Sequence, residues 1–464
     1  MMATNLAVDL RALITGQVLD DPAARADRSS DFGRMIHRLP GVVVRPASTQ
    51  DVATVIGYAR KNAVAVALRG EAHTQSGQAT VADGILIDLT SLDRILEIDP
   101  SGLSADCQAG VKWETLVRQS IQQAVVPPVL TNNLGVTIGG TLSVAGLGVA
   151  SFRYGAQGDN VTELEVVTGT GDVVVCSETK AREVFDAVRS TLGQFGVITR
   201  ARLRLRRCKP KTRTYFLLYD DLGAVMRDAQ AVIERDRVDY LESTCVPCPQ
   251  GFRSAGAIKE AFAAWFFPLQ LTVEFDPQSA PDDAQVLQGL APYRRTHVED
   301  QETFGFAARL EPLFALWKRI GNWAMPHPWT ETIIPWGAAH PFISQVLASL
   351  PPTALGGGHV LLWPCRGTVS RIPYFMYPPT PLVMGFGILP GVPPDVLPQA
   401  RQRLNMVSDM SMAVGAKRYL SGFIEFDRPR WKQHFGPRWD EIRRLKKTYD
   451  PDGILNPGFI DYGP

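Results

Sequence analysis

The chain has 464 residues, more than one hydrophobic core usually serves, so we expect two domains. It carries 48 basic and 47 acidic residues, and this balance argues against binding to nucleic acid or to an anionic membrane surface. The six cysteines are too sparse to indicate a disulfide framework, and no apolar run of about 20 residues predicts a membrane span. The N-terminus lacks the pattern of a secretory signal, so we expect a cytoplasmic protein.

The first part of the chain predicts strands and helices in alternation. Residues 41–47 predict a strand, a capping signature then predicts a helix, and residues 63–70 predict a second strand that ends at glycine. A polar turn containing His73 follows. Residues 84–99 predict a further strand and turn, and residues 111–124 have the spacing of a helix.

Glycines punctuate the next part of the chain. Residues 135–148 contain five glycines among small residues and predict a loop whose backbone a ligand can approach. Residues 163–177 predict a β-hairpin. Residues 181–207 predict a helix, a glycine-containing break and a long strand.

The composition changes after Cys208, which predicts a second domain. Strands are expected near residues 213–220 and 267–275, and helices near residues 221–234 and 280–293. The chain ends with a predicted amphipathic helix, a turn and a Pro-Gly stop.

The segment LRGEAHTQSGQA (68–79) carries the strongest chemical signal. A strand leads into a turn with little side-chain bulk at Gly70 and Ala72, where backbone N–H groups can converge on a pyrophosphate. Thr74 and Gln78 can add side-chain hydrogen bonds. A second loop of small residues, GGTLSVAG, follows later in the chain, and neither loop fits the GxGxxG fingerprint of a Rossmann domain.

The motif RGEAHTQSGQA resembles the RGxGHSxxGQA motif of the vanillyl-alcohol-oxidase superfamily, and more narrowly the chain is similar to the cytokinin dehydrogenases. The likeness recurs in order at VTIGGTLSVAG, RYGAQGDNVTELEVVTGTGDVVVCS, GQFGVITRARLRL, DYLE, WKQHFG and YDPDGILNPG. The resemblance implies an α+β fold. A PCMH-type FAD-binding domain of two small subdomains would occupy residues 1–207 and return at 415–464. A substrate-binding cap domain, with an antiparallel sheet flanked by helices, would occupy residues 208–414.

The resemblance also implies how FAD is held. His73 matches the histidine that bonds the 8α-methyl group of the flavin, and a neutral imidazole is a competent nucleophile. We expect a single covalent link, because the loop after Val129 has no cysteine for a second one. The other residues that match cofactor-contacting positions are Leu68, Gly70, Glu71, Ala72, Thr74, Gln78, Thr137, Ser143, Leu147, Val197, Tyr419, Asn456 and Phe459.

Three residues of the histidine motif depart from the family pattern. Ala72 and Thr74 stand where the family has glycine and serine, and both changes are small. Glu71 replaces a common arginine and brings a negative charge near the pyrophosphate. We therefore expect its backbone N–H, rather than its side chain, to serve the cofactor.

The most informative departure is Asn132, where cytokinin dehydrogenases carry an aspartate that accepts a proton or hydrogen bond from the substrate amine. An amide cannot act as a base near neutral pH, so Asn132 can only orient a donor. This favours an amine that is already unprotonated over an alcohol, or else a substrate that is not a cytokinin. Glu242 matches a cap-domain glutamate that hydrogen-bonds the purine, with a solvated strand-end acid as the alternative.

The remaining polar candidates predict structure more than chemistry. His327, His340 and His359 are expected to be packed loop histidines, and no pair of histidines has metal-ligand spacing, so we expect no metal. Cys245 and Cys248 form a single CxxC, interpreted as two loop or strand cysteines rather than a metal or redox pair. Four tryptophans can wall an apolar planar pocket, although most such aromatics are core: Trp323, Trp329, Trp336 and Trp363.

These observations predict an FAD-dependent oxidase or dehydrogenase that passes hydride from a small organic substrate to flavin N5, with oxygen or a quinone as electron acceptor. The leading substrate is a secondary amine of cytokinin type, an N6-substituted adenine, oxidised to an imine that hydrolyses. The alternative enzyme is an oxidase of a secondary-metabolite pathway that acts on an alcohol, a sugar or a ring C–H bond. The non-enzyme alternative binds flavin without turnover.

Overall fold

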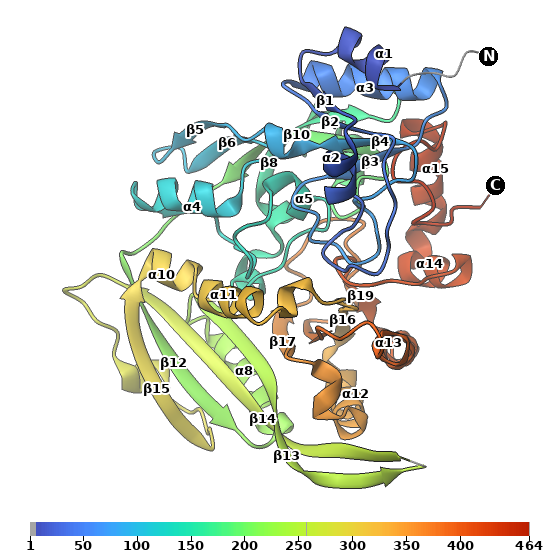
Figure 1. The fold of residues 1–464 in the computed structure, drawn as a ribbon. Coiled ribbons are helices and arrows are strands. Elements are labelled where there is room, and N and C mark those ends of the chain that lie inside the picture. The colour runs from blue at the N-terminus through green and yellow to red at the C-terminus, as the bar shows by residue number, and fades with distance from the viewer. Residues whose placement is uncertain (1–5, 257, 464) are drawn as a thin grey trace.

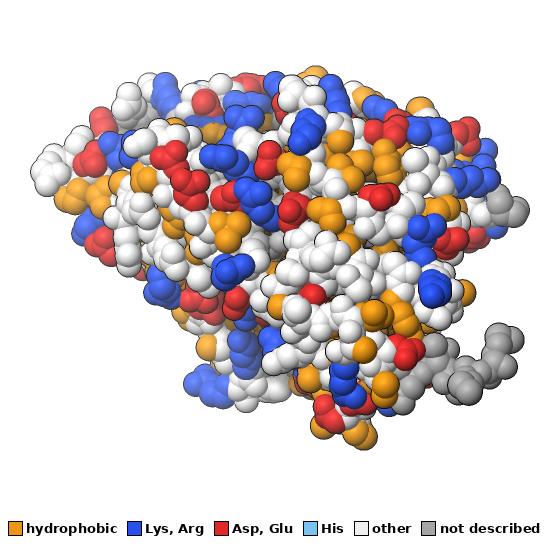
Figure 2. Space-filling view, turned by 90° about the horizontal axis from the view of Figure 1, so that it is seen from above, with side chains coloured by type: hydrophobic (Ala, Val, Ile, Leu, Met, Phe, Trp, Pro, Cys, Tyr) orange, Lys and Arg blue, Asp and Glu red, His pale blue; other side chains and the backbone are white. Residues whose placement is uncertain are grey.

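A computed structural model describes residues 6–256 and 258–463 and shows two small sheets above one large antiparallel sheet (Figure 1). Residues 125–126 and 206–207 form a further sheet of two short strands. The predicted α+β class, with an antiparallel sheet in the second half of the chain, is confirmed. No helix among the described residues is long and apolar enough to cross a membrane. In the face shown in Figure 2, acidic and basic side chains are interspersed.

The first sheet has strand order β1-β2-β4-β3, and its last three strands are parallel. Ser48 begins the helix that connects two of these strands, because its side chain accepts a hydrogen bond from the backbone N–H of Asp51. The elements of this part are α1 (Leu6–Leu13), β1 (Gln17–Leu19), α2 (Pro22–Asp27), β2 (Val42–Arg45), α3 (Thr49–Lys61), β3 (Val66–Arg69), β4 (Ile85–Asp88) and η1 (Leu89–Ser91).

The second sheet is antiparallel with strand order β5-β6-β10-β8-β9, and the predicted hairpin over 163–177 forms its β8–β9 edge. The segment 135–148 is not wholly loop, because residues 138–142 make one short helix. The elements are β5 (Ile95–Asp99), β6 (Ser104–Gln108), α4 (Trp113–Ile121), β7 (Val125–Val126), α5 (Ile138–Leu142), α6 (Ser151–Tyr154), η2 (Gln157–Asn160), β8 (Val161–Thr168), β9 (Val173–Cys176), α7 (Arg182–Val188), β10 (Gly196–Arg204) and β11 (Arg206–Arg207).

The large sheet has eight strands in the order β15-β12-β14-β13-β17-β18-β16-β19. The helix predicted near 221–234 is confirmed as α8, whereas the helix predicted over 280–293 is wrong, since only α9 forms there. The strands are β12 (Lys211–Tyr219), β13 (Tyr240–Ala255), β14 (Ile258–Phe275), β15 (Arg294–Glu302), β16 (Thr330–Pro335), β17 (His359–Arg366), β18 (Leu382–Leu389) and β19 (Lys417–Arg418). The helical elements are α8 (Leu222–Arg235), α9 (Asp283–Val286), α10 (Thr303–Ala307), α11 (Glu311–Arg319), η3 (Asn322–Ala324), α12 (Trp336–Ser349), η4 (Pro352–Leu355) and α13 (Leu397–Ala413).

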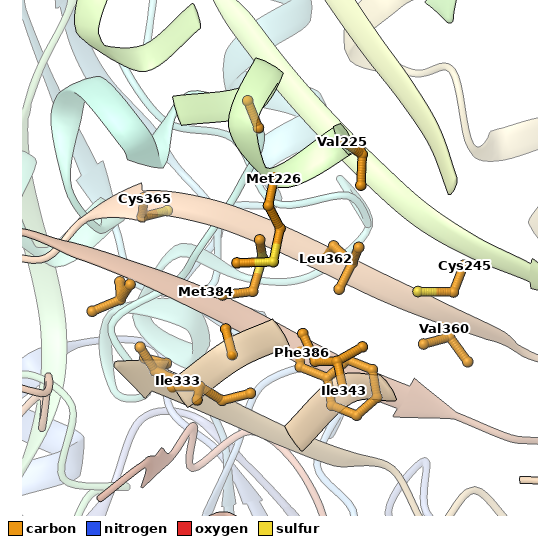
Figure 3. Close-up of a cluster of buried hydrophobic side chains, with 14 of the residues drawn as sticks. Val225, Met226, Cys245, Ile333, Ile343, Val360, Leu362, Cys365, Met384 and Phe386 are labelled. Carbon is orange, nitrogen blue, oxygen red and sulfur yellow. The ribbon is translucent and has the colours of Figure 1, made fainter. Parts of the chain in front are cut away.

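Side-chain alternation gives the large sheet two different faces. Met384 and Phe386 of β18 enter a buried cluster with Leu362 of β17 and with side chains from α8 and α12 (Figure 3). Gly385, which lies between them, and Gly387, which follows Phe386, belong to the other face of the sheet. A Cβ atom at Gly385 would lie 2.5 Å from the indole of Trp363, so glycine makes room for that ring. The same strands thus build a core on one face and an open, aromatic-lined surface on the other.

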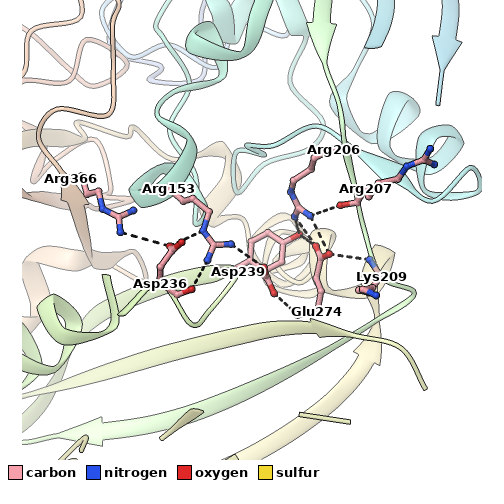
Figure 4. A network of polar contacts seen from close by, with 9 residues as sticks. Arg153, Arg206, Arg207, Lys209, Asp236, Asp239, Glu274 and Arg366 are labelled. Carbon is pink, nitrogen blue, oxygen red and sulfur yellow. Dashed lines mark hydrogen bonds and ion pairs between the residues drawn. The ribbon is translucent and has the colours of Figure 1, made fainter. Parts of the chain in front are cut away.

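Ion pairs join the large sheet to the preceding part of the chain (Figure 4). Arg206, largely buried, pairs with Glu274 of β14 at 2.7 Å and donates to the hydroxyl of Tyr240 at 2.8 Å. Arg153 of α6 pairs with Asp236 at 2.9 Å and with Asp239 at 3.1 Å. Because both arginines carry more than one partner, they fix the position of the large sheet geometrically as well as electrostatically.

The end of the chain returns to the first sheet. After α14 (Arg428–Phe435), η5 (Gly436–Arg438) and α15 (Trp439–Tyr449), Leu455 forms a parallel bridge with Val66 of β3. Asn456 accepts a hydrogen bond from the backbone N–H of Leu68 and donates to the backbone oxygen of Leu192. The predicted terminal helix is therefore two helices, and the tail secures the strand that leads to His73.

Candidate functional site

One cavity is lined by loops of the two small sheets and by strands of the large sheet. We call its lining residues from 68 to 198, together with Asn456, the loop side, and those from 310 to 421 the sheet side. The predicted site residues among them are Leu68, Gly70, Glu71, Ala72, His73, Thr74, Gln78, Asn132, Thr137, Ser143, Leu147, Tyr419 and Asn456. Residues far apart in the sequence therefore meet in one space.

The turn before His73 is shaped by close contacts. A Cβ atom at Gly70 would lie 2.2 Å from Oγ1 of Thr137, so a larger residue does not fit there. Ala72 has a φ of 50°, in the left-handed region that favours glycine, which gives a physical reason for the glycine of the family pattern. Thr137 in turn caps α5 by accepting from the backbone N–H of Gly140.

Asp31 anchors the other end of this turn. Its Oδ2 accepts hydrogen bonds from Oγ1 of Thr74 at 2.8 Å and from the backbone N–H of Gly77 at 2.7 Å. Burial raises the pKa of this carboxyl to about 6. The histidine between these anchors is thus held from both sides.

His73 is enclosed by aromatic rings. Its ring centre lies 4.2 Å from that of Phe32 and 5.5 Å from that of Trp329, and the ring of His327 stacks on that of Phe32 at 4.3 Å. Burial lowers the pKa of His73 to about 4, with a smaller contribution from nearby His327. The imidazole is therefore neutral near pH 7 and keeps a nitrogen lone pair for a new bond.

Several polar groups on the loop side fit a large polar cofactor. Nε2 of Gln78 is buried without a hydrogen-bond partner among the described residues, while its Oε1 accepts from the backbone N–H of Ser76. Such an unused buried donor is costly unless a ligand accepts from it. The hydroxyl of Tyr419 approaches the loop side as well, accepting from the backbone N–H of Leu147 at 3.2 Å.

Glu71 forms an ion pair with Lys112, with 2.9 Å between Oε1 and Nζ. The positive charge of Lys112 offsets the negative charge of Glu71 in this turn. Ser143 uses its hydroxyl to donate to the backbone oxygen of Gly139 at 2.8 Å. Both side chains therefore stabilise the loops that line the cavity.

Asn132 belongs to a cluster with Glu242 and Arg309, both from the part of the chain after Cys208. Its Nδ2 donates to Oε1 of Glu242 at 3.2 Å, and its Oδ1 accepts from Nη2 of Arg309 at 2.8 Å. Arg309 also donates to Oε2 of Glu242 from Nε at 3.1 Å and from Nη2 at 2.9 Å. The two predicted catalytic residues are thus in contact, and the arginine that joins them was missed because it stands in a segment without a recognisable motif.

Glu331 is a second residue that sequence reasoning missed. It lies on β16, lines the cavity and accepts a hydrogen bond on Oε2 from the hydroxyl of Ser421 at 2.5 Å. Burial raises the pKa of this carboxyl to about 7, although Ser421 and Arg418 oppose the shift. A carboxyl that titrates near neutrality is suited to proton transfer.

Three predicted site residues are placed outside the cavity lining. Glu242 is hydrogen-bonded to Asn132 but does not line the cavity itself. Val197 has its side chain in the core of the first sheet. The ring of Phe459 packs 5.4 Å from that of Trp431. The neighbours of Val197, Gly196 and Ile198, do line the cavity.

The histidines and tryptophans of the second half have different surroundings. His359 lines the cavity, with its ring centre 5.6 Å from that of Trp317, whereas His340 is exposed on α12. Trp329 and Trp363 line the cavity as well. Trp323 and Trp336 are not among the lining residues: the first contacts Phe32 and the second packs on the core.

The CxxC cysteines both lie on β13, Cys245 buried and Cys248 exposed. In the part of the chain that the structure describes, no three His, Cys, Asp or Glu side chains are grouped in a way that could hold a metal ion.

Comparisons with known proteins agree with this geometry. Residues 40–177 match a family described as FAD binding domain, and residues 210–460, more than half of the chain, match one described as cytokinin dehydrogenase 1, FAD and cytokinin binding. An uncharacterized oxidoreductase of the fasciation locus of Rhodococcoides fascians is 31% identical, over 93% of this chain and 95% of that protein. Cytokinin dehydrogenase 2 of Arabidopsis thaliana is 28% identical over 98% of this chain and 95% of its own length. Cytokinin dehydrogenase 9 of rice is 30% identical over 93% of this chain and 87% of its own length. The chain therefore belongs to the cytokinin dehydrogenase family of FAD-linked oxidoreductases.

Proposed function

We propose that this oxidoreductase holds FAD covalently through His73 and oxidises a secondary amine of cytokinin type at a carbon bonded to nitrogen. The observation that carries the proposal is the single cavity that His73, Asn132 and the aromatic residues of the large sheet share. FAD, when bound, supplies a two-electron acceptor for hydride. The protein's own residues bind, orient and move protons around that transfer.

His73 would supply the imidazole nitrogen that bonds the 8α-carbon of the flavin. Formation of this link removes one proton from the imidazole, one proton from the methyl group and two electrons, which dioxygen or a quinone takes up. The low pKa of His73 supports this role, because the nucleophilic nitrogen is unprotonated over the physiological range. The turn held by Asp31 keeps the ring in place.

The sheet side supports a planar, largely apolar substrate. Trp329 and Trp363 line it together with Phe314, Trp317 and Leu361. Aromatic rings of this kind accept a flat heteroaromatic group between their faces. An N6-substituted adenine has that shape, and its side chain carries the C–H bond beside nitrogen that is oxidised to an imine, which then hydrolyses.

Glu242 and Asn132 would position the substrate through their cluster with Arg309. The remaining cofactor assignments, including Val197 and Phe459, and the division of the chain at residues 207 and 414 belong to the same proposal. The second candidate function, oxidation of an alcohol, a sugar or a ring C–H bond, is favoured by one observation: the amide of Asn132 stands where the family has a carboxylate.

Product analysis separates the two functions. The purified protein is incubated with N6-isopentenyladenine and a quinone, and adenine and the released aldehyde are measured by chromatography. Equimolar adenine and aldehyde would support amine oxidation. Unchanged substrate, with oxidation of an alcohol from a substrate panel, would replace it with the second function.

A further inference from the structure

The cavity has a carboxyl group whose role the family likeness does not explain. Among the described residues that line it, two carry carboxyl groups, Glu71 and Glu331. Glu71 is paired with Lys112. Glu331 has no ion-pair partner among the described residues, and its one hydrogen bond there, from Ser421, goes to Oε2 and leaves Oε1 without a donor. One cavity carboxyl is therefore free to interact with a ligand.

Asn132 cannot take a proton from the substrate, for reasons of chemistry and of geometry. An amide is not a base near neutral pH. Both of its polar atoms are also engaged, Nδ2 with Glu242 and Oδ1 with Arg309. Glu242 lies outside the cavity lining and is held by two hydrogen bonds from Arg309. Proton removal must therefore use another group.

The surroundings of Glu331 suit that task. It is opposite Gly387 in the sheet register, where a Cβ atom would lie 2.9 Å from the Trp363 indole and 3.5 Å from Cγ of Glu331. The glycine thus lets the carboxyl and the indole lie side by side at the cavity surface. Ser421, which also lines the cavity, orients Oε2 by its hydrogen bond.

The charged and titratable groups around Glu331 leave it able to change protonation state. Arg418, on neighbouring β19, directs its guanidinium to Oγ of Ser408 and to the backbone oxygens of Glu331 and Phe423 rather than to the carboxylate. Tyr419, the other titratable neighbour, has its pKa raised by burial and stays protonated. Neighbouring β18 contributes Gly387. Burial accordingly dominates and raises the pKa of Glu331 to about 7.

We propose that Glu331 is the base of this enzyme and accepts the N–H proton of the substrate amine while the adjacent carbon loses hydride to FAD. This inference rests on the proposed function. The nitrogen–carbon single bond becomes a double bond, the two electrons and one hydrogen pass to FAD, and the proton passes to the carboxylate. In this assignment the base lies on the sheet side of the cavity, whereas Asn132 lies on the loop side.

His359 is the competing base. It lines the cavity, and its Nδ1 is buried without a hydrogen-bond partner among the described residues. Burial lowers its pKa to about 4, so the imidazole is a weak proton acceptor at pH 7. A His359→Gln variant therefore serves to separate the two groups.

The test is anaerobic reduction of the bound flavin by N6-isopentenyladenine, followed by its visible absorbance from pH 5 to 9. For the wild type we expect the rate to rise through pH 7, because the base acts in its deprotonated form. Glu331→Gln should slow flavin reduction about 100-fold or more and remove the rise of the rate through pH 7. Glu331→Gln combined with Asn132→Asp should regain part of the rate. His359→Gln should still show the rise of the rate through pH 7. The exposed Glu97→Gln is the matched control.

Infrared spectroscopy of the oxidised holoprotein gives a readout that needs no turnover. A protonated-carboxyl band with a midpoint near pH 7 should be present in the wild type and absent in Glu331→Gln, whereas the band of Asp31, with a midpoint near pH 6, should remain. If Glu331→Gln does not retain flavin, Ser421→Ala keeps the carboxyl, and loss of its hydrogen bond should move the band's midpoint upward by about one pH unit.

The outcomes distinguish the two proposals. A wild-type rate and pH step unchanged in Glu331→Gln, or an unmoved infrared midpoint in Ser421→Ala, would overturn the role of Glu331 and leave amine oxidation standing. A wild-type flavin that no secondary amine reduces would overturn both.

Discussion

The loop side and the sheet side of the cavity are built in different ways. The loop side takes most of its polar groups from short runs of sequence, and the turn at Gly70–Thr74 is fixed by backbone shape and by Asp31. The sheet side collects side chains from α11, β16, β17 and the segment after β19. The difference teaches that the residues proposed to attach the cofactor come from local stretches of sequence, whereas the residues proposed to handle the substrate come together only when distant segments are assembled.

The largest effect is expected on the loop side. His73→Ala should abolish covalent attachment of flavin, because no other side chain is proposed to form the bond. After denaturing electrophoresis the wild-type band should fluoresce and the variant band should not. His340→Ala, at an exposed histidine, should keep the fluorescence; its loss there, or its retention in His73→Ala, would show that another residue carries the link.

The next largest effect, on stability, is expected at the cluster of Asn132, Glu242 and Arg309. Arg309→Ala would leave Glu242 buried without its cation and Asn132 without its donor, and we expect a loss of about 3 kcal/mol in the free energy of unfolding. Chemical denaturation measures it. Arg428→Ala, at an exposed ion pair with Asp461, is the control and should change little. Equal losses in both variants would mean that the Asn132 cluster has no special role in stability.

Asn132→Asp tests whether this loop-side residue takes part in substrate oxidation. It restores the family's carboxylate at 3.2 Å from Glu242, where repulsion between the two acids favours proton uptake. We expect flavin reduction by cytokinin-type amines to become about tenfold faster, a change of about 1.4 kcal/mol in the barrier. Stopped-flow absorbance follows it. Unchanged reduction in a folded, flavin-loaded variant would count against a role for this position.

The smallest effect should come from backbone shape. Ala72→Gly relieves a left-handed alanine and should raise the free energy of unfolding by about 0.5 to 1 kcal/mol, net of the methyl group lost. Ala79→Gly, a buried alanine at the end of the same loop without a positive φ, should lower it by a similar amount. The two denaturation midpoints should therefore move in opposite directions, and a shift in the same direction would mean that φ at Ala72 costs nothing.

The fold and the loop side were largely predictable. The capped helix after Ser48, the 163–177 hairpin and α8 follow from local patterns, and the histidine motif predicted the loop-side residues around His73. Outside the loop side the sequence was less informative: it pointed to Tyr419, Trp329 and Trp363, but not to Glu331 on the sheet side or to Arg309 beside Asn132. Arg309 and Glu331 carry no motif, and their importance arises from burial and from partners over 60 residues away in the sequence. The expected helix at 280–293 is a single turn, Asp283–Val286, and Gly289, which follows it, adopts a positive φ of 75° that does not continue a helix.

The most direct test of the central claim is the visible spectrum of the purified protein under anaerobic conditions, before and after addition of N6-isopentenyladenine. We predict a yellow flavin band that bleaches on addition of the amine, with the flavin still attached to the chain after denaturation. A colourless protein, or a band that stays oxidised with every secondary amine offered, would contradict it.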